Sequence, residues 1–299
     1  MEKMLLTGVT GFLGRNFMES LDKNKYEVFA AGRNCPPFMD REHFFVTDLK
    51  DPAGVSEVIE RISPDVLVLF AWDVSMQSYW ETLENCVWAD ICIQTAEVFL
   101  ENEGRQILFA GTSASYDYGK GFLKELPEYE HPSSLYGISK LYTSQVLCKL
   151  AKRYDALYCE ARIFAIYGKY EKRNRLIPLT AWRLSQNEKI VNTCGELQRD
   201  YIYIGDAVNA IHLLLETKAT GVYNISSGKP VSIRRIVMRV AEELGKPELI
   251  EFDNSNKTDD SPLIVGDNAK LEDLGFVSAY SLESGIRQTL DWMMKEGKL

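Results

Sequence analysis

Tyr136 and Lys140 stand four residues apart in the segment YGISK, and their side chains have acid–base chemistry. That spacing places a phenol and an ammonium on one face of a helix. A free tyrosine has a pKa of about 10 and is a poor base at neutral pH, but a nearby positive charge favours the phenolate. Such a phenol can pass a proton to or from a carbonyl oxygen while hydride moves on the adjoining carbon. On its own, a Tyr–Lys pair is more often part of a solvated helix face.

A hydroxyl at the end of a strand is the second chemical feature. The run 106–110 is strand-like, and Thr112 and Ser113 follow it. The carboxyl ends of parallel strands are where a doubly wound sheet binds its ligand. Thr112 can therefore hydrogen-bond a reacting oxygen and stabilise developing charge, with Ser113 as a substitute. Because Ser and Thr are also ordinary turn formers, this assignment depends on the Tyr–Lys pair downstream.

A glycine-rich turn near the N-terminus predicts nucleotide binding. The segment TGVTGFLG places Gly8, Gly11 and Gly14 between an apolar strand at 3–7 and a helix at about 12–22. The first glycine permits a tight turn, the second lets the backbone approach a pyrophosphate, and the third lets helix and strand pack closely. The helix N-terminus then faces the anion. Its position after the first strand favours nucleotide binding over an ordinary turn.

The residues after the second strand indicate which dinucleotide is bound. NAD-specific folds place a carboxylate there for the ribose 2′-hydroxyl. This chain has Gly32, Arg33 and Asn34 and no acid. A guanidinium can pair bidentately with a 2′-phosphate, although it can also be a solvated loop arginine. We expect NADP(H) to be preferred, with NAD(H) possible, and we expect Asp48 and Leu49 to contact the adenine.

Strand-like and helix-like segments alternate through the first part of the chain. A strand at 28–31 precedes a helix that begins at an Asp51–Pro52 N-cap and ends at Ser63–Pro64. This alternation predicts an α/β fold with a Rossmann-type doubly wound parallel sheet. We place this lobe at 1–167, with a return segment near 200–222, and a smaller C-terminal substrate-binding lobe at 168–299. The later elements are a strand at 66–70, a helix near 79–101, a strand at 106–110, a helix at about 134–154, a strand at 156–164, and helices near 231–244 and 281–295.

Composition excludes several classes of protein. The 299 residues are 45% hydrophobic and 26% charged, which argues against disorder and fibrous structure. A formal net charge of −9 argues against nucleic acid or an anionic membrane as the main partner. The longest apolar run, 66–72, is far shorter than the roughly 20 residues of a membrane-spanning helix. With no signal-peptide pattern at the N-terminus, we expect a cytoplasmic protein.

The cysteines and histidines predict neither a disulfide framework nor a metal site. The six cysteines form no C-x-x-C pair, so we interpret them as buried thiols. The three histidines are widely spaced, and we expect no metal. A Ser-His-Asp triad would also lack the G-x-S-x-G turn that presents a nucleophile.

Together these segments resemble the extended short-chain dehydrogenase/reductase family, in the group that acts on nucleotide-activated sugars. The resemblance covers nearly the whole chain and includes Asn85, RIFAIYG at 162–168, RDYIYIGD at 199–206 and YNISSG at 223–228. It implies an NAD(P)-binding lobe, a second lobe that grips a nucleoside-diphosphate sugar, and a homodimer. Arg199 matches the family's diphosphate-contacting arginine, and we expect the loops around Leu176 to help select the substrate.

The residue patterns and the resemblance together define the expected site. Trp72 replaces a small residue of the family and can either line the pocket or be an ordinary core or rim side chain. The expected catalytic residues are Thr112, Tyr136 and Lys140; the expected cofactor-binding residues are Gly8, Thr10, Gly11, Phe12, Leu13, Gly14, Arg33, Asn34, Asp48, Leu49, Phe70, Ala71, Trp72, Asn85, Tyr136, Lys140, Phe164 and Ile166; the expected substrate-binding residues are Ser113, Leu176 and Arg199.

Departures from the family's patterns bear on the reaction. Dehydratases carry Asp-Glu directly after the catalytic Thr, where this chain has Ser113 and Ala114, so we do not expect dehydration. Ala165 replaces a substrate-binding Asn, which weakens the transfer of sugar contacts from relatives. The segment GTSASYD at 111–117 is similar to the GTCAEYD stretch of nucleotide 4-keto-6-deoxysugar reductases of the abequose-synthase kind.

We therefore predict NADPH-dependent reduction of the C4 ketone of a nucleoside-diphosphate 4-keto-6-deoxy or dideoxy sugar, in deoxysugar biosynthesis for surface polysaccharide or glycoconjugate. Tyr136 would protonate the oxyanion, Thr112 would hold it, and Lys140 would anchor the nicotinamide ribose and tune Tyr136. One alternative is an NAD-dependent nucleotide-sugar 4-epimerase, although Arg33 favours the NADPH that a reductase consumes. A non-catalytic dinucleotide-sensing protein of the same fold is the alternative from another class. The sequence does not determine the nucleotide base, the sugar or the configuration produced at C4.

Overall fold

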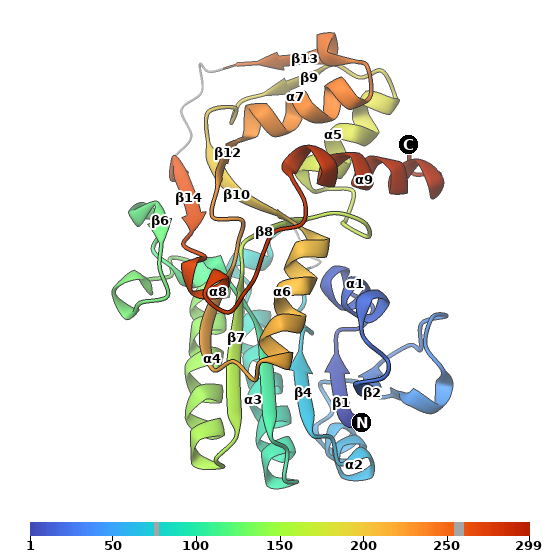
Figure 1. The fold of residues 1–299 in the computed structure, drawn as a ribbon, viewed down its shortest axis with the longest axis vertical. Coiled ribbons are helices and arrows are strands. Elements are labelled where there is room, and N and C mark those ends of the chain that lie inside the picture. The colour runs from blue at the N-terminus through green and yellow to red at the C-terminus, as the bar shows by residue number, and fades with distance from the viewer. Residues whose placement is uncertain (75–77, 254–259) are drawn as a thin grey trace. The chain divides into compact units, whose positions relative to one another are not determined.

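A computed structural model describes residues 1–74, 78–253 and 260–299 (Figure 1). The chain divides into two compact units. Unit 1 comprises Met1–Asp117, Leu126–Arg162 and Ile211–Tyr223. Unit 2 comprises Tyr118–Glu125, Ile163–Ala210 and Asn224–Leu299.

Unit 1 is built on a seven-stranded sheet in the order β11-β7-β5-β4-β1-β2-β3. β1 pairs in parallel with both β2 and β4, and β5 continues the sheet in parallel beside β4. Every residue of β4 and β5 is buried, as expected for parallel strands that are covered on both faces. The predicted α/β doubly wound fold is confirmed. The strands are β1 (Glu2–Thr7), β2 (Tyr26–Gly32), β3 (Phe44–Val46), β4 (Val66–Leu69), β5 (Gln106–Thr112), β7 (Leu157–Ile163) and β11 (Gly221–Ile225).

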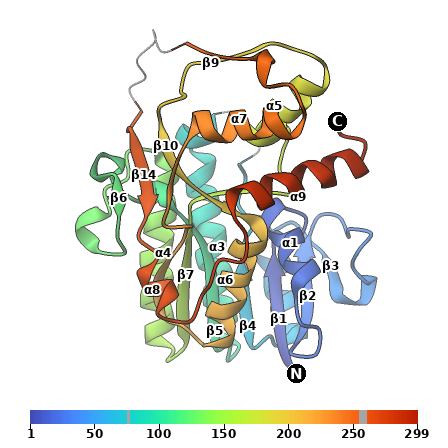
Figure 2. The ribbon, with the colours of Figure 1, turned by 45° about the horizontal axis from the view of Figure 1, so that its top comes forward.

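Helices cover both faces of this sheet (Figure 2). One buried cluster joins Val58 of α2, Phe99 of α3 and Leu147 of α4 to the strands. On the opposite face Phe17 of α1 stacks on His212 of α6, with ring centroids 4.6 Å apart. The helices are α1 (Phe12–Ser20), α2 (Pro52–Ile62), α3 (Glu84–Glu101), α4 (Leu135–Arg153) and α6 (Ile204–Glu216), with short 3₁₀ turns η1 (Arg41–His43), η2 (Tyr79–Glu81), η3 (Ser113–Ser115) and η5 (Pro127–Tyr129).

Local hydrogen bonds accompany the starts of two of these helices. The Asp51 carboxylate accepts a hydrogen bond from the Ala53 N–H at 3.2 Å, which confirms the predicted N-cap of α2. The predicted helix near 79–101 was wrong at its start, because η2 comes first and α3 begins at Glu84. There the Thr82 hydroxyl accepts from the Glu84 N–H at 3.3 Å and supports a new helix start.

In its described residues, unit 2 contains short strands and four complete helices, and the first part of α6, up to Ala210, also belongs to it. Its main sheet has the order β12-β10-β14-β6, with β8 beside β10, and β13 pairs with β9. The predicted helices near 231–244 and 281–295 are confirmed as α7 and α9. The strands are β6 (Phe122–Leu123), β8 (Ala165–Tyr167), β9 (Ile190–Asn192), β10 (Gln198–Tyr203), β12 (Pro230–Ser232), β13 (Ile250–Phe252) and β14 (Leu263–Gly266); the helices are α5 (Leu176–Ser185), α7 (Ile233–Glu243), α8 (Ala269–Glu272) and α9 (Leu282–Lys295), with 3₁₀ turns η4 (Tyr118–Lys120) and η6 (Pro247–Leu249).

The cysteines depart in part from the expectation that they are buried. All six thiols are free, and Cys92 and Cys159 are buried. Cys86 and Cys148 are exposed, because they lie on outward faces of α3 and α4. Within the described residues, no helix is long and apolar enough to cross a membrane.

Candidate active site

The glycine-rich turn packs directly against the segment that follows β4. The Thr7 hydroxyl donates to the Val68 carbonyl at 3.4 Å and accepts from the Ala71 N–H at 3.3 Å. Gly8 has a φ of +77°, and a Cβ there would lie 2.6 Å from the Ala71 nitrogen. A side chain at Gly8 would therefore be excluded both by backbone conformation and by space.

The same turn leads into α1 in a way that suits an anion. A Cβ at Gly14 would lie 2.3 Å from the Gly8 oxygen, so the helix approaches the strand as closely as the sequence predicted. Gly11 is the N-cap of α1, and the backbone N–H groups of Phe12, Leu13 and Gly14 begin the helix without intrahelical acceptors. These N–H groups and the helix dipole fit the pyrophosphate of a dinucleotide.

The predicted adenosine end of the site is open. Arg33 and Asn34 are exposed directly after β2, and Asp48 is exposed after β3. The Asp48 Oδ1 accepts from the Lys50 N–H at 3.0 Å, and the Leu49 side chain packs against the buried cluster. Arg33, Asn34 and Asp48 therefore offer charged and polar groups to solvent, whereas Leu49 faces the protein interior.

A cavity of about 420 Å³ adjoins the glycine-rich turn. Thr10 of the turn lines it together with Arg15 of α1 and the segment 36–38 that follows β2. The Arg15 guanidinium lies over the Phe38 ring, 5.3 Å from its centroid. Sequence reasoning missed Arg15, although its place directly after Gly14 was visible in the sequence.

The first turn of α4 positions Tyr136 beside η3. Ser134 caps the helix by accepting from the Gly137 N–H at 3.1 Å. A Cβ at Gly137 would lie 2.1 Å from the Ala114 oxygen, so the glycine lets the helix backbone rest directly on η3. Tyr136 is half-buried in this turn. The segment that carries Thr112 is thereby held against the helix that carries the predicted phenol and ammonium.

Thr112 ends β5 and caps the turn that follows. Its hydroxyl oxygen accepts from the Ala114 N–H at 3.2 Å, and the residue is 8% exposed. As an acceptor in this bond, the hydroxyl keeps its own proton for donation. Ser113 is half-buried in η3.

The residue before Thr112 is a glycine because a buried carboxylate occupies the neighbouring space. A Cβ at Gly111 would lie 2.0 Å from the Glu160 Oε1. Glu160 of β7 is fully buried and accepts from the Arg162 Nε at 2.8 Å. This ion pair, which the sequence analysis did not identify, lies beside Gly111 and supports the end of β5.

Lys140 lies in a closed environment one turn after Tyr136. It is 3% exposed, and its Nζ donates to the Ala110 carbonyl at 2.7 Å. The Nζ also lies over two aromatic rings, 4.0 Å from the Trp72 centroid and 4.7 Å from the Phe109 centroid. Burial lowers the pKa of Lys140 to about 8, while Cys92 and Glu160 act in the opposite direction. A lysine with this pKa can be charged at pH 7 and can titrate in mildly alkaline solution.

Trp72 and Asn85 are joined by a hydrogen bond. The Trp72 Nε1 donates to the Asn85 Oδ1 at 2.9 Å. The Asn85 Nδ2 donates to the carbonyls of Tyr79 and Thr82, at 2.7 and 2.9 Å. Both ends of the buried Asn85 amide are thus bonded to the protein, and its predicted contact with the cofactor stays a prediction.

Aromatic rings surround Tyr136. Tyr79, Trp80 and Trp72 meet its ring nearly edge to face, at centroid distances of 5.3, 5.5 and 6.3 Å. Phe70, at the end of β4, contacts Phe17 edge to face at 5.4 Å. The sequence analysis selected Trp72 but missed Tyr79 and Trp80, for which the only signal was a pair of adjacent aromatic residues.

Four predicted site residues belong to unit 2, and their predicted contacts with cofactor and substrate stay predictions. Phe164 is buried and its N–H donates to the Ile225 carbonyl at 3.1 Å. Ile166 pairs with Ile202 in the register of β8 with β10. Leu176 begins α5. The Arg199 Nη1 donates to the carbonyls of Gln198 and Ser261, at 2.9 and 2.8 Å.

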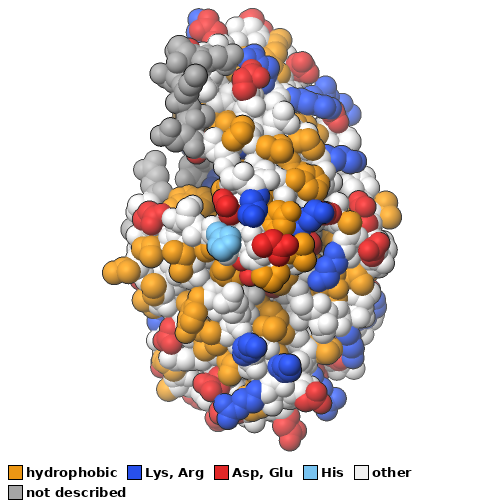
Figure 3. All heavy atoms as spheres, turned by 90° about the vertical axis from the view of Figure 1, so that its left-hand side faces the viewer, with side chains coloured by type: hydrophobic (Ala, Val, Ile, Leu, Met, Phe, Trp, Pro, Cys, Tyr) orange, Lys and Arg blue, Asp and Glu red, His pale blue; other side chains and the backbone are white. Residues whose placement is uncertain are grey.

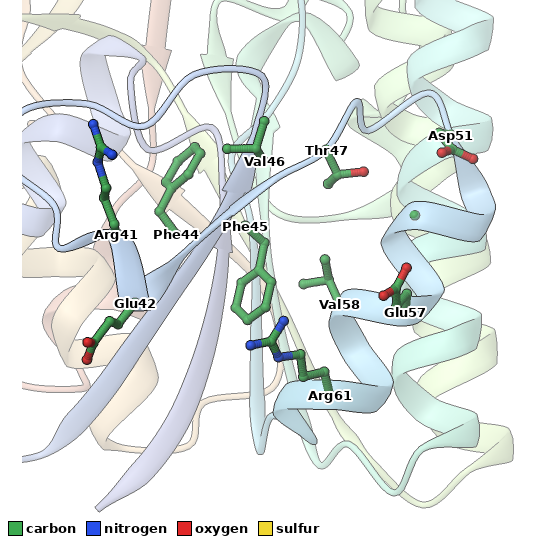
Figure 4. A pocket seen from close by; sticks show the side chains of 11 residues that line it. Arg41, Glu42, Phe44, Phe45, Val46, Thr47, Asp51, Glu57, Val58 and Arg61 are labelled. Atoms are coloured by element: carbon green, nitrogen blue, oxygen red, sulfur yellow. The ribbon is translucent and has the colours of Figure 1, made fainter.

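A further cavity of unit 1, of about 520 Å³, lies between η1, β3 and α2 (Figure 4). Arg61 of α2 lies over the Phe45 ring, 5.2 Å from its centroid, and Arg41, Glu42 and Glu57 add charges of both signs. None of the candidate catalytic residues lines this cavity. Within the described residues, no group of acidic, histidine and cysteine side chains could hold a metal ion.

Comparison with known proteins agrees with this architecture. The chain is 28% identical over 307 residues to a dTDP-4-dehydro-6-deoxyglucose reductase of Escherichia coli, covering 95% of each chain. It is 24% identical over 311 residues to a putative UDP-glucose 4-epimerase of Methanocaldococcus jannaschii, covering 99% of each. The crystal structure of a Thermus thermophilus UDP-glucose 4-epimerase with NAD shares the fold, with a TM-score of 0.83, 23% identity and coverage of 98% of this chain and 99% of that one.

A match to the sequence model of a protein family covers most of unit 1. The sequence model of the NAD dependent epimerase/dehydratase family matches residues 4–226. That range includes the glycine-rich turn, the strand that ends at Thr112, and the Tyr136–Lys140 pair. It also includes the return segment that supplies β11. The chain therefore belongs to the NAD dependent epimerase/dehydratase family, within the extended short-chain dehydrogenases/reductases.

Proposed function

We propose that this protein is an NADPH-dependent reductase of the C4 ketone of a nucleoside-diphosphate 4-keto-6-deoxy or dideoxy hexose. The observation that carries the proposal is the set of groups held together in unit 1. They are the phenol of Tyr136, the buried ammonium of Lys140 and the hydroxyl of Thr112, with Ser113 and Ala114 following in place of an acid and a base. Such a set suits proton transfer to one carbonyl oxygen and offers no second acid–base pair for an elimination.

Each residue has a defined task in this reaction. A nicotinamide cofactor held by the glycine-rich turn and Lys140 would supply hydride to the carbonyl carbon. Tyr136 gives its proton to the ketone oxygen as negative charge develops there, and the Thr112 hydroxyl donates a hydrogen bond to the same oxygen. Lys140, while protonated, stabilises the phenolate that remains and anchors the nicotinamide ribose.

The substrate class is supported by sequence similarity. The E. coli relative at 28% identity is named as a reductase of a 4-dehydro-6-deoxy sugar nucleotide. We assign Arg199 to the diphosphate, and Ser113 and Leu176 to the remaining substrate contacts. The reaction would belong to deoxysugar biosynthesis in the cytoplasm, for surface polysaccharide or glycoconjugate.

The preference for NADPH is supported by two arginines near the predicted adenosine ribose. Arg33 follows β2, where NAD-specific folds have a carboxylate, and it is exposed. Arg15 lines the cavity beside the glycine-rich turn with Thr10. Two guanidinium groups favour a 2′-phosphate over a 2′-hydroxyl, because they form charge-assisted hydrogen bonds with the phosphate oxygens.

A homodimer is supported by apolar side chains on the outer faces of α3 and α4. Val87 of α3 is 42% exposed, and Ile138 and Tyr142 of α4 are 48% and 55% exposed. The side of the molecule on which α4 lies carries several hydrophobic side chains (Figure 3). Exposed apolar side chains that recur along paired helices favour association with another copy. Light scattering coupled to gel filtration tests this, and a Tyr142→Glu variant that stays associated contradicts this choice of surface.

A 4-epimerase is the second candidate, because the M. jannaschii and T. thermophilus relatives are named as 4-epimerases. An epimerase must reduce its intermediate again with the same cofactor molecule, so it retains NAD. Tightly bound NAD after purification, together with interconversion of nucleotide hexoses and no net NADPH consumption, would select this alternative.

The deciding experiment is a screen of NADPH oxidation against 4-keto nucleotide sugars that differ in base and deoxygenation. The proposal expects stoichiometric oxidation with at least one of them, and product NMR then gives the C4 configuration. Tyr136→Phe is the matched inactive control. Cofactor binding without turnover on any of these ketones would overturn the reductase assignment. It would favour the alternative of a non-catalytic dinucleotide-sensing protein.

A further inference from the structure

We propose that Trp72 is a positioning residue for the Tyr136–Lys140 pair, holding both side chains with its indole ring and offering an aromatic face to the Lys140 ammonium. This inference rests on the proposed roles of Tyr136 and Lys140. It adds a residue that influences the reaction only through its contacts with Tyr136 and Lys140.

The first support is that one indole touches both members of the pair. The Lys140 Nζ lies 4.0 Å from the Trp72 ring centroid, well within the distance of a cation–π interaction. The Tyr136 ring meets the same indole at 6.3 Å and 77°, an edge-to-face arrangement. Movement of Trp72 would therefore remove one contact from Lys140 and one contact from Tyr136 at the same time.

The second support is that the indole itself is fixed. Its Nε1 donates to the Asn85 Oδ1, and the Asn85 amide is held by two backbone carbonyls of the Tyr79–Thr82 segment. Asn85 is 1% exposed, so water hardly competes for these bonds. A buried amide with partners on both sides has one preferred orientation. The Asn85 Oδ1 is therefore fixed, and it fixes the position of the indole Nε1 that donates to it.

The third support is that the buried Lys140 ammonium needs groups that replace water around it. Lys140 is almost fully buried and donates to the Ala110 carbonyl. A buried cation is costly unless hydrogen bonds, opposite charges or aromatic faces replace water. The titratable groups that interact with it are Cys92 from α3 and Glu160 from β7, and Tyr136 lies one turn earlier on its own helix. Among the described residues no carboxylate forms an ion pair with the Nζ, and the Trp72 face supplies stabilisation in its place.

Two substitutions at Trp72 separate its aromatic face from its bulk. Trp72→Leu keeps an apolar cover over Lys140 but removes the aromatic face, whereas Trp72→Phe keeps a smaller aromatic face and loses the bond to Asn85. Trp292→Leu is the matched control, because it removes a tryptophan from a Lys298 contact of 3.9 Å in unit 2.

The readout is the pH dependence of the dissociation constant of NADPH, measured by fluorescence titration, alongside that of kcat/KM. We expect Trp72→Leu to move the alkaline limb of both profiles down by about one pH unit, since a desolvated cation–π contact contributes on the order of 1–2 kcal/mol. Trp72→Phe should move it by less than half as much, and Trp292→Leu should leave it unchanged. Binding of adenosine 2′,5′-bisphosphate, which lacks the nicotinamide ribose, should keep its wild-type pH profile in all variants.

Two outcomes overturn the proposal. One is an alkaline limb in Trp72→Leu that coincides with wild type, and the other is an equal shift in the Leu and Phe variants. Should Trp72→Leu fail to fold, Asn85→Leu decides the question, because it frees the indole without removing a ring and should shift the limb in the same direction. Failure of the proposed function is distinguishable: it appears as full turnover in Tyr136→Phe, or as no turnover in wild type, whatever the Trp72 variants do.

Discussion

The two ends of the candidate cofactor site in unit 1 are built in opposite ways. At the reaction end, Lys140 is 3% exposed, and Trp72 and Thr112 have identified hydrogen-bond partners inside the protein. At the adenosine end, Arg33 and Asp48 are exposed within two residues of the ends of their strands. Buried, bonded groups are set in place before ligands arrive, whereas exposed groups contribute when a ligand orders them. Substitutions should therefore change rates at the first end and cofactor choice at the second.

The largest effect should come from removing the phenol at the reaction end. Tyr136→Phe should lower kcat by about 10³-fold, because a positioned general acid contributes roughly 10²–10⁴ in rate. The dissociation constant of NADPH should change by less than about threefold, since the other predicted contacts remain. NADPH oxidation and fluorescence titration measure the two quantities. A variant within tenfold of wild-type turnover would contradict the role of Tyr136.

A smaller effect at the same end should follow from Gly137→Ala. A Cβ at that position would lie 2.1 Å from the Ala114 oxygen, so α4 must move away from η3. Displacement of reacting groups by about 1 Å can cost on the order of 10²-fold in rate. Gly285→Ala is the control, because its Cβ would meet the Tyr167 Oη at 2.3 Å in unit 2. Both variants should lose thermal stability, but equal losses of kcat/KM would show that the contact with η3 has no special role.

The adenosine end should show the reverse behaviour. Arg33→Ala should weaken NADPH binding by about 10- to 100-fold, since hydrogen bonds to charged groups contribute roughly 1.5–3 kcal/mol. NADH binding and kcat at saturating NADPH should stay near wild type. Arg41→Ala, which alters an exposed arginine on η1, is the control. Equal losses for NADPH and NADH would remove the distinction between the two ends.

The last effect concerns the stability cost of burying Lys140. Its pKa is lowered to about 8 in the folded protein, against about 10.4 in an unfolded chain. Below pH 8 both states carry the proton, and the folded state bears the full cost of the buried charge. As the pH rises from 8 to 10 the folded state loses its proton first, so wild-type stability should rise relative to Lys140→Met by about 2–3 kcal/mol. Urea unfolding of both proteins at pH 7.5, 8.5 and 9.5 checks this, and parallel curves would contradict it.

Local patterns were enough to predict the parts of the structure that depend on neighbours in sequence. The N-cap at Asp51, the glycine-rich turn and the helix that carries Tyr136 and Lys140 were predicted within a few residues. Each depends on capping, on glycine conformations or on helical spacing, which act over a few residues. The parallel sheet followed from strand–helix alternation.

The remaining site geometry depends on contacts between distant segments. Trp72 was selected from its position after β4, but its contacts with Lys140 and Asn85 join three segments and cannot be read from spacing. Gly111 is similar, because the carboxylate that fills its side-chain space is Glu160, 49 positions later. Close packing of this kind is a property of the assembled tertiary structure.

The short strand β3 has a consequence for handling the protein in concentrated solution. It ends the order of the seven-stranded sheet, and its last residue, Val46, is 71% exposed. An open sheet edge is a template for strand addition by a neighbouring chain, and charged side chains beside it oppose that aggregation. Charged side chains, among them Arg41 and Arg61, line the cavity next to β3 (Figure 4). We therefore expect these charges to keep the sheet of one molecule from being extended by a strand of another.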